Sequence, residues 1–123
     1  MDDFYDLFKK LKEIMLPYAR KLDCKIDNDT ELYVDTKHIL KNKKPLWFGA
    51  VQVKKNYVSY HLMPVYLNPE LLNGISPGLK KRMQGKSCFN FRTPDDKFFE
   101  ELAALTESGY TDYKRRDYII DVD

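Results

Sequence analysis

The sequence contains few of the residues that build metal sites and disulfides, with two cysteines and two histidines among 123 residues. Cys24 and Cys88 are far apart in the chain, and no two candidate ligands stand at the short spacing that structural zinc sites use. This pattern excludes a structural zinc site. Reduced thiols in the cytosol are a simpler interpretation of the two cysteines than a disulfide.

Long apolar runs are also absent, and no segment approaches the ~20 apolar residues that a membrane-spanning helix requires. The first six residues include three aspartates and no apolar run, so we expect no secretory signal there. The net charge is only +2, because 21 basic residues stand against 19 acidic ones, and so small an excess creates no strong field. We therefore expect a cytoplasmic protein with no membrane partner, and we do not expect it to bind nucleic acid.

What the chain does contain is typical of a folded domain. Hydrophobic residues make up 43% of it and aromatic residues 14%, which excludes disorder and favours a core rich in rings. The length suits one domain, and the sequence shows no repeat, low-complexity segment or linker. We therefore expect a single domain over residues 1–123.

Helical periodicity appears near both ends of the chain. Apolar residues recur at helical spacing over residues 4–18, where Pro17 is expected to kink or interrupt the helix. A second helix is predicted to begin with Thr93 as its cap and to end at Gly109. Residues 110–123 are then expected to fray, or to form an extended arm that packs on the body or joins a second subunit in a homodimer.

Between these helices, apolar and polar residues alternate with a period of two, which predicts strands buried on one face. The predicted strands cover residues 25–29, 32–36, 47–53, 57–63 and 86–91. If Val53 pairs with Val58, the hairpin places Trp47 on the core face and Phe48 on the opposite face. This order of elements predicts an α+β, two-layer sandwich: an antiparallel sheet with the N- and C-terminal helices on one face.

The second face of the predicted sheet collects chemically varied side chains. The cations Lys81, Arg82 and Arg92 flank the last strand and suit a phosphate or carboxylate group. We therefore expect this face to bind a small anionic ligand or a partner protein. The ligand-binding residues predicted on it are Gln52, Ser59, His61, Lys86, Cys88 and Asn90.

A thiol-dependent enzyme is an alternative function, because Cys88 and His61 fall on the same predicted face. Such chemistry requires the two side chains to lie within hydrogen-bond reach and the thiol pKa to be lowered. The sequence indicates neither an oxyanion hole nor a third group that would orient the histidine. We therefore assign no catalytic residue and favour binding over catalysis.

Three runs carry a family resemblance: Trp47-Phe-Gly-Ala-Val, Tyr57-Val-Ser-Tyr-His-Leu-Met-Pro, and Gly85-Lys-Ser-Cys-Phe-Asn-Phe before a Pro-Asp-Asp helix start. Together they resemble the YdhG-like family, bacterial domains of unknown function. The likeness covers residues 30–108. This family is similar in fold to frataxin, so the resemblance implies a frataxin-like sheet and helices. It also implies iron binding or delivery as an alternative function.

Iron binding of the frataxin kind uses carboxylates on the first helix and on the adjoining strand edge. The lysines at positions 9, 10, 12 and 25 interrupt this acidic ridge and lower its attraction for a hard cation. Iron is the only cofactor that the resemblance implies. The carboxylates at comparable places in this chain are Asp2, Asp3, Asp6, Asp27, Asp29 and Glu31.

Overall fold

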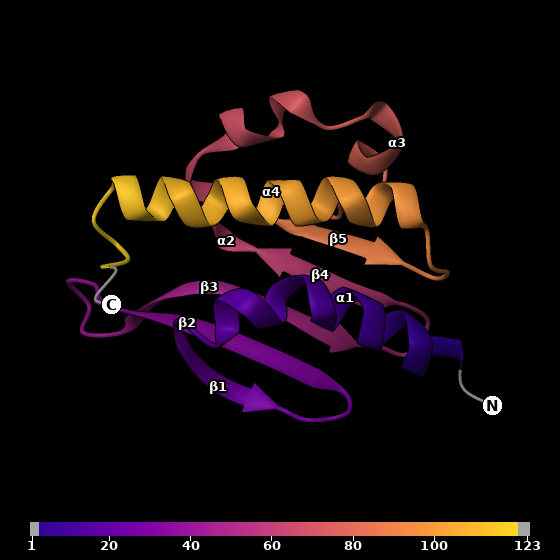
Figure 1. Ribbon diagram of the computed structural model, residues 1–123, viewed down its shortest axis with the longest axis horizontal. Coiled ribbons are helices and arrows are strands. Elements are labelled where there is room, and N and C mark those ends of the chain that lie inside the picture. Colours follow the sequence, from indigo (N-terminus) through magenta and orange to yellow (C-terminus); the bar gives the residue numbers. More distant parts are fainter. Residues whose placement is uncertain (1–2, 121–123) are drawn as a thin grey trace.

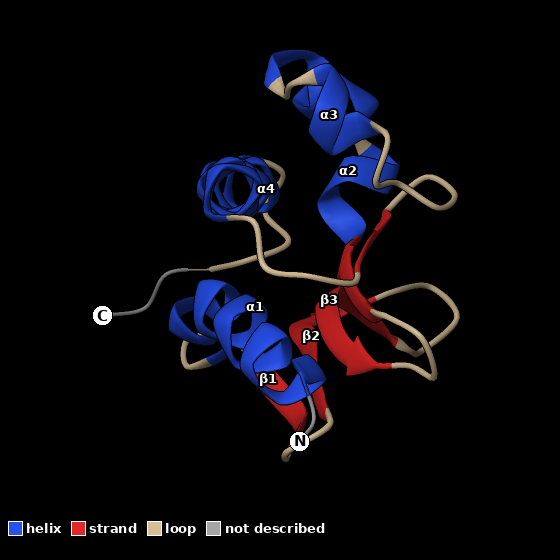
Figure 2. Cartoon of the chain, turned by 90° about the vertical axis from the view of Figure 1, so that its right-hand side faces the viewer, coloured by secondary structure: helices blue, strands red, loops and turns tan. Residues whose placement is uncertain are grey.

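The computed structural model describes residues 3–120 (Figure 1). One layer is a five-stranded antiparallel sheet in the order β1-β2-β3-β4-β5. Its strands are β1 (Asp23–Asp27), β2 (Glu31–Ile39), β3 (Pro45–Val53), β4 (Val58–Leu62) and β5 (Cys88–Phe91). The second layer is formed by α1 (Asp3–Ala19) and α4 (Asp96–Arg115). Figure 2 shows both helices on the same face of the sheet, so the predicted two-layer α+β class is confirmed.

The hydrophobic core lies between these two layers. Leu7, Leu11 and Met15 recur at helical spacing on α1 and are fully buried, as are Tyr60 on β4 and Phe89 on β5. The helix continues through Pro17 to Ala19, so the predicted interruption is wrong. Pro17 lies in the last turn, where its missing N–H removes only one hydrogen bond near the helix end. None of the helices within residues 3–120 is long and apolar enough to cross a membrane.

A β-bulge in β3 reverses the predicted sidedness at the start of the hairpin. Val34 pairs with Gly49 and Asp35 with Trp47, so Phe48 is an extra residue opposite β2. Phe48 consequently points into the core and is fully buried, whereas Trp47 turns to the other face. The predicted pairing of Val53 with Val58 is correct. The predicted sidedness is therefore wrong only at Trp47 and Phe48, on the N-terminal side of β3.

The C-terminal helix is longer than predicted. It is capped by Asp95, whose side chain accepts a hydrogen bond from the Phe98 N–H, and not by Thr93. The helix also runs through Gly109. A Cβ at this position would lie 2.8 Å from the Pro64 Cβ, which explains why the position holds glycine. Gly109 therefore permits the close approach of α4 to α2 (Met63–Leu67) and does not end the helix.

The predicted C-terminal arm is wrong over residues 110–115, which are helical. Tyr113 is fully buried, and its hydroxyl donates a 2.9 Å hydrogen bond to the Trp47 carbonyl oxygen on β3. The chain then folds back, since the Tyr118 N–H donates to the Tyr113 carbonyl at 2.8 Å and Ile119 is buried. No extended arm is left within residues 110–120 to join a second subunit. Residues 121–123 lie outside the described part of the chain.

Three short helices connect β4 to β5 and pack beside α4 (Figure 1). They are α2, the 3-10 helix η1 (Pro69–Gly74) and α3 (Pro77–Lys80). Ser76 caps α3 by accepting a hydrogen bond from the Leu79 N–H at 3.2 Å, and Pro77 occupies the first helical position. This connection returns the chain to the free edge of β5, where the candidate site lies.

Candidate functional site

The strand register aligns polar residues on the sheet face turned away from α1 and α4. Gln52 pairs with Ser59 and Ser59 with Asn90, while His61 pairs with Cys88 in the neighbouring row. Their sequence neighbours Val58, Tyr60 and Leu62 are buried in the core, so these residues point the opposite way. The polar face therefore brings together Gln52, Ser59, His61, Cys88 and Asn90.

Side-chain hydrogen bonds link the members of the polar face. Ser59 Oγ lies 3.0 Å from His61 Nε2, and the Cys88 thiol donates to Asn90 Oδ1 at 3.3 Å. At the β2 side, Gln52 Nε2 donates to Glu31 Oε2 at 2.7 Å. Ser59 is buried and the others are half-buried, so their orientations are held before any ligand arrives.

Burial keeps both titratable groups of this face neutral at neutral pH. Desolvation lowers the pKa of His61 below its ordinary value, and the positive charge of Lys54 lowers it further, while Glu31 opposes the change. Desolvation also raises the pKa of Cys88 to about 11, although Lys54 acts in the opposite direction. The face therefore offers a neutral imidazole and a protonated thiol.

This arrangement does not favour the thiol-dependent enzyme. Cys88 Sγ lies 3.8 Å from His61 Nε2, within reach of a hydrogen bond to sulfur, but Ser59 Oγ lies closer to the same nitrogen, at 3.0 Å. The raised pKa of the thiol also opposes formation of the thiolate nucleophile. The pair is consequently better suited to hydrogen bonding than to nucleophilic attack.

An aromatic wall borders the polar face, and the β-bulge creates it. The rings of Tyr33 and Trp47 stack with centroids 5.5 Å apart, and Trp47 lies equally close to the His61 ring. The indole Nε1 donates to the Gly49 carbonyl oxygen at 3.0 Å, which fixes the orientation of the ring. The alternating pattern does not predict this wall of Tyr33 and Trp47, because it places Trp47 on the core face.

A short segment before β5 extends the sheet by one partial strand. The Asn90 N–H donates to the Arg82 carbonyl oxygen, and the Gln84 N–H donates to the Cys88 carbonyl oxygen, each at 2.9 Å. Met83 forms a bridge with Phe89, which points to the core. The backbone of Arg82 therefore lies beside Asn90, and that of Gln84 beside Cys88, at the edge of the sheet.

A groove of about 630 Å³ opens beside this added edge. Three of its lining residues, Lys81, Arg82 and Arg92, are cations, and its lining contains no carboxylate. Within residues 3–120, these three cations form no ion pair. Arg82 is further positioned over the Phe98 ring, 5.9 Å from its centroid. The groove is lined by Tyr57, Lys81, Arg82, Met83, Gln84, Asn90 and Arg92.

The groove shares Asn90 with the predicted ligand-binding residues and takes its charge from the cations predicted to flank the last strand. Lys86, in contrast, is exposed in the bend before β5 and does not line the groove. Gln84 is a lining residue that the sequence pattern does not single out. Tyr57 has the same strand parity as Ser59 and His61, so the alternation already predicts it on their face, and it lies just beyond the pair formed by Val58 and Phe91.

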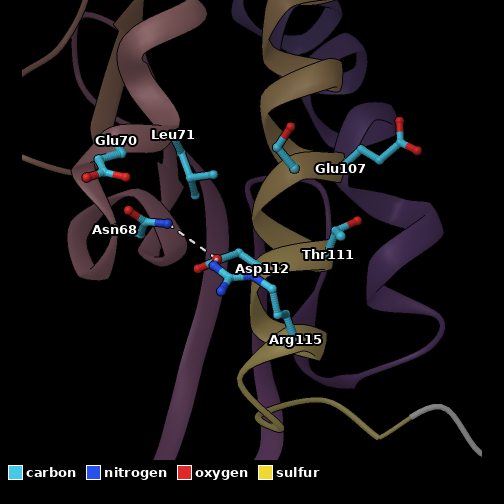
Figure 3. Close-up of a pocket in the computed structure, with 8 residues that line it drawn as sticks. Asn68, Glu70, Leu71, Glu107, Thr111, Asp112 and Arg115 are labelled. Carbon is cyan, nitrogen blue, oxygen red and sulfur yellow. Dashed lines mark hydrogen bonds and ion pairs between the residues drawn. The ribbon is translucent and has the colours of Figure 1, made fainter.

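A second hollow, of about 520 Å³, lies between η1 and α4 (Figure 3). Asp112 is buried there and forms ion pairs with Arg115 and Arg116, while Asn68 Nδ2 donates to its Oδ1 at 3.3 Å. Burial alone would raise the pKa of Asp112, but the hydrogen bonds from the two arginines lower it below its ordinary value. This carboxylate is therefore satisfied within the protein and serves to join η1 to the end of α4.

The carboxylates suggested for iron do not form a metal site in the described part of the chain. Within residues 3–120, no group of three or more His, Cys, Asp or Glu side chains is placed to hold a metal ion. Asp27 instead forms a 2.5 Å ion pair with Lys12, and Asp6 and Asp29 are exposed. Asp2 and the side chain of Asp3 lie outside the described residues, and Glu31 is bonded to Gln52.

No family model, curated protein or solved structure matches this chain at a significant level. The resemblance to the YdhG-like family therefore remains a prediction from the three sequence runs, and so does the frataxin-like assignment.

Proposed function

We propose that this chain is a cytoplasmic binding domain that takes a small anionic molecule, bearing phosphate or carboxylate groups, in the groove beside β5. The observation that carries this proposal is the composition of the groove, whose lining includes Lys81, Arg82 and Arg92 and no acidic side chain. A volume of about 630 Å³ also suits a small ligand. The two free cysteines agree with a reducing compartment.

Each lining residue has a distinct part in this proposal. Arg82 and Arg92 present planar forks of N–H donors that match the oxygen pairs of phosphate and carboxylate, while Lys81 adds a point charge. Asn90 supplies an amide donor between the arginines and the polar face. His61 stays neutral, so it contributes a hydrogen bond from the adjoining row and adds no charge.

An NMR titration with a panel of phosphate-bearing and dicarboxylate metabolites tests this proposal. We expect chemical-shift changes to concentrate at the backbone of residues 81–84 and 90–92 and at the side-chain amide of Asn90. The only tryptophan, Trp47, stands on the same sheet face and provides a fluorescence readout. Shifts scattered over α1 and α4, or no saturable change with any probe, would refute the proposal.

A further inference from the structure

The hairpin tip between β2 and β3 combines exposed apolar side chains with a concentration of positive charge. Ile39 and Leu40 are 57% and 36% exposed, in a chain that buries most of its large aliphatic residues. Lys37 precedes them, and Lys41, Lys43 and Lys44 follow; all four lysines are exposed. We define residues 37–44 as the basic tip.

The basic tip is a well-formed turn. The Leu40 N–H donates to the Lys44 carbonyl oxygen at 2.8 Å, and the Lys43 N–H donates to the Leu40 carbonyl oxygen at 2.9 Å. Asn42 Oδ1 accepts a 2.9 Å hydrogen bond from the Lys44 N–H, and Lys43 adopts a left-handed backbone with φ 69°. The turn therefore holds Ile39 and Leu40 outward at little additional entropic cost on binding.

The sequence around the basic tip carries no acidic side chain. Between Asp35 and Glu70 the sequence contains no acidic residue, and within residues 3–120 none of the four lysines of the tip forms an ion pair. A net charge of +2 for the whole chain thus conceals a strongly positive end. The field of these lysines extends beyond the protein because no carboxylate of the tip opposes it.

The end of the chain adds to the same surface. The Tyr118 ring contacts the His38 ring at a centroid distance of 5.0 Å, which brings the segment after α4 beside the base of the tip (Figure 1). Ile120 follows this contact and is 78% exposed. Three large aliphatic side chains are therefore exposed at the end of the molecule that carries the lysines.

The geometry points to an anionic lipid surface as the partner of the basic tip, in contrast to the absence of a membrane partner expected from the small net charge. Lysines attract the negative surface of a bilayer, and the adjacent Ile39 and Leu40 can enter the boundary between headgroups and acyl chains. Nucleic acid would use the same lysines, but it would leave these two aliphatic side chains without a role. The tip lies at the Pro45 end of β3, whereas the anion groove lies beyond its Val53 end, so this inference does not rest on the proposed function.

Vesicle co-sedimentation tests the inference with the full-length chain. We expect binding to vesicles of phosphatidylcholine and phosphatidylglycerol in equal parts, little binding to pure phosphatidylcholine, and a decline as salt is raised. The triple variant Lys41→Gln/Lys43→Gln/Lys44→Gln should lower the partition constant at least tenfold. The variant Ile39→Ser/Leu40→Ser should lower it by about the same factor, because the aliphatic contribution is lost.

The matched control removes three lysines elsewhere, as Lys9→Gln/Lys55→Gln/Lys97→Gln, and should change the partition constant less than threefold. Circular dichroism confirms that each variant is folded. Equal loss in both triple variants, or binding that does not depend on phosphatidylglycerol, would overturn the inference. It would also be overturned if the chain bound single-stranded DNA in preference to anionic vesicles and Ile39→Ser/Leu40→Ser left that binding unchanged.

Discussion

The backbone N–H of Asn90 donates a 2.9 Å hydrogen bond to the carbonyl oxygen of Arg82. This bond places the backbone of Arg82 beside Asn90, which ends the cross-strand row of Gln52 and Ser59, and Asn90 also lines the groove. The cationic groove and the hydrogen-bonded polar face are therefore parts of one surface. A ligand anchored by its anionic group at Arg82 would meet the neutral donors and acceptors of the polar face next.

The thiol of Cys88 should react slowly with alkylating agents. Burial raises its pKa to about 11, so its thiolate fraction at pH 8 should be roughly two hundredfold below that of a cysteine in an unstructured peptide. The measurement is the iodoacetamide rate of Cys24→Ser, in which Cys88 is the only remaining thiol. A rate equal to that of the peptide would show that the thiol is activated and would revive the enzymatic alternative.

The stability of the protein should fall as the pH drops below the ordinary pKa of histidine. The pKa of His61 is lowered in the folded state, so the unfolded state binds more protons below about pH 6.5, and the free energy of unfolding decreases there. One histidine can contribute a slope of at most about 1.4 kcal/mol per pH unit. Urea unfolding between about pH 7 and pH 5 should show a shallower slope for His61→Gln than for the wild type. Identical slopes would contradict the assignment of a half-buried, neutral His61.

Substitution of Gly109 should destabilise the contact between α2 and α4. A Cβ at this position would lie 2.8 Å from the Pro64 Cβ and 3.0 Å from its Cγ. We expect Gly109→Ala to lower the free energy of unfolding by about 1–3 kcal/mol, although alanine is the better helix former. Gly74→Ala is the matched control, because a Cβ there meets nothing within 4 Å. Thermal unfolding compares the two; equal stabilities would show that α2 moves freely to accommodate the methyl group.

Local sequence patterns predict the antiparallel sheet and the pairing of its central hairpin. Period-two alternation and the polar turn before Val58 gave the correct pairing with Val53. Alternation failed at Phe48, because a β-bulge adds one residue and a sequence pattern does not reveal where the pleat is interrupted. The predicted helix end at Gly109 is wrong for a related reason. Glycine stands at position 109 because α4 packs closely against Pro64 of α2. In the sequence alone, such a glycine cannot be distinguished from one that ends a helix.

The candidate site was only partly predictable. The cross-strand neighbours Ser59, His61 and Cys88 followed from the alternation, since paired strands align residues of the same face. The edge formed by Arg82 and Gln84 did not, because this short segment directly follows α3 and has too few residues for an alternating pattern. Only the hydrogen bonds between this segment and β5 show that Arg82 belongs to the sheet surface.

The most direct test of the central claim is calorimetric titration with inorganic pyrophosphate at low salt. Arg82→Gln/Arg92→Gln should raise the dissociation constant at least tenfold, because each charge-assisted hydrogen bond contributes about 1.5–3 kcal/mol. Lys9→Gln/Lys97→Gln removes the same charge outside the groove and should change it less than twofold. Equal weakening by both variants, or a wild-type chain that releases no heat of binding with pyrophosphate, would contradict an anion site built from Arg82 and Arg92.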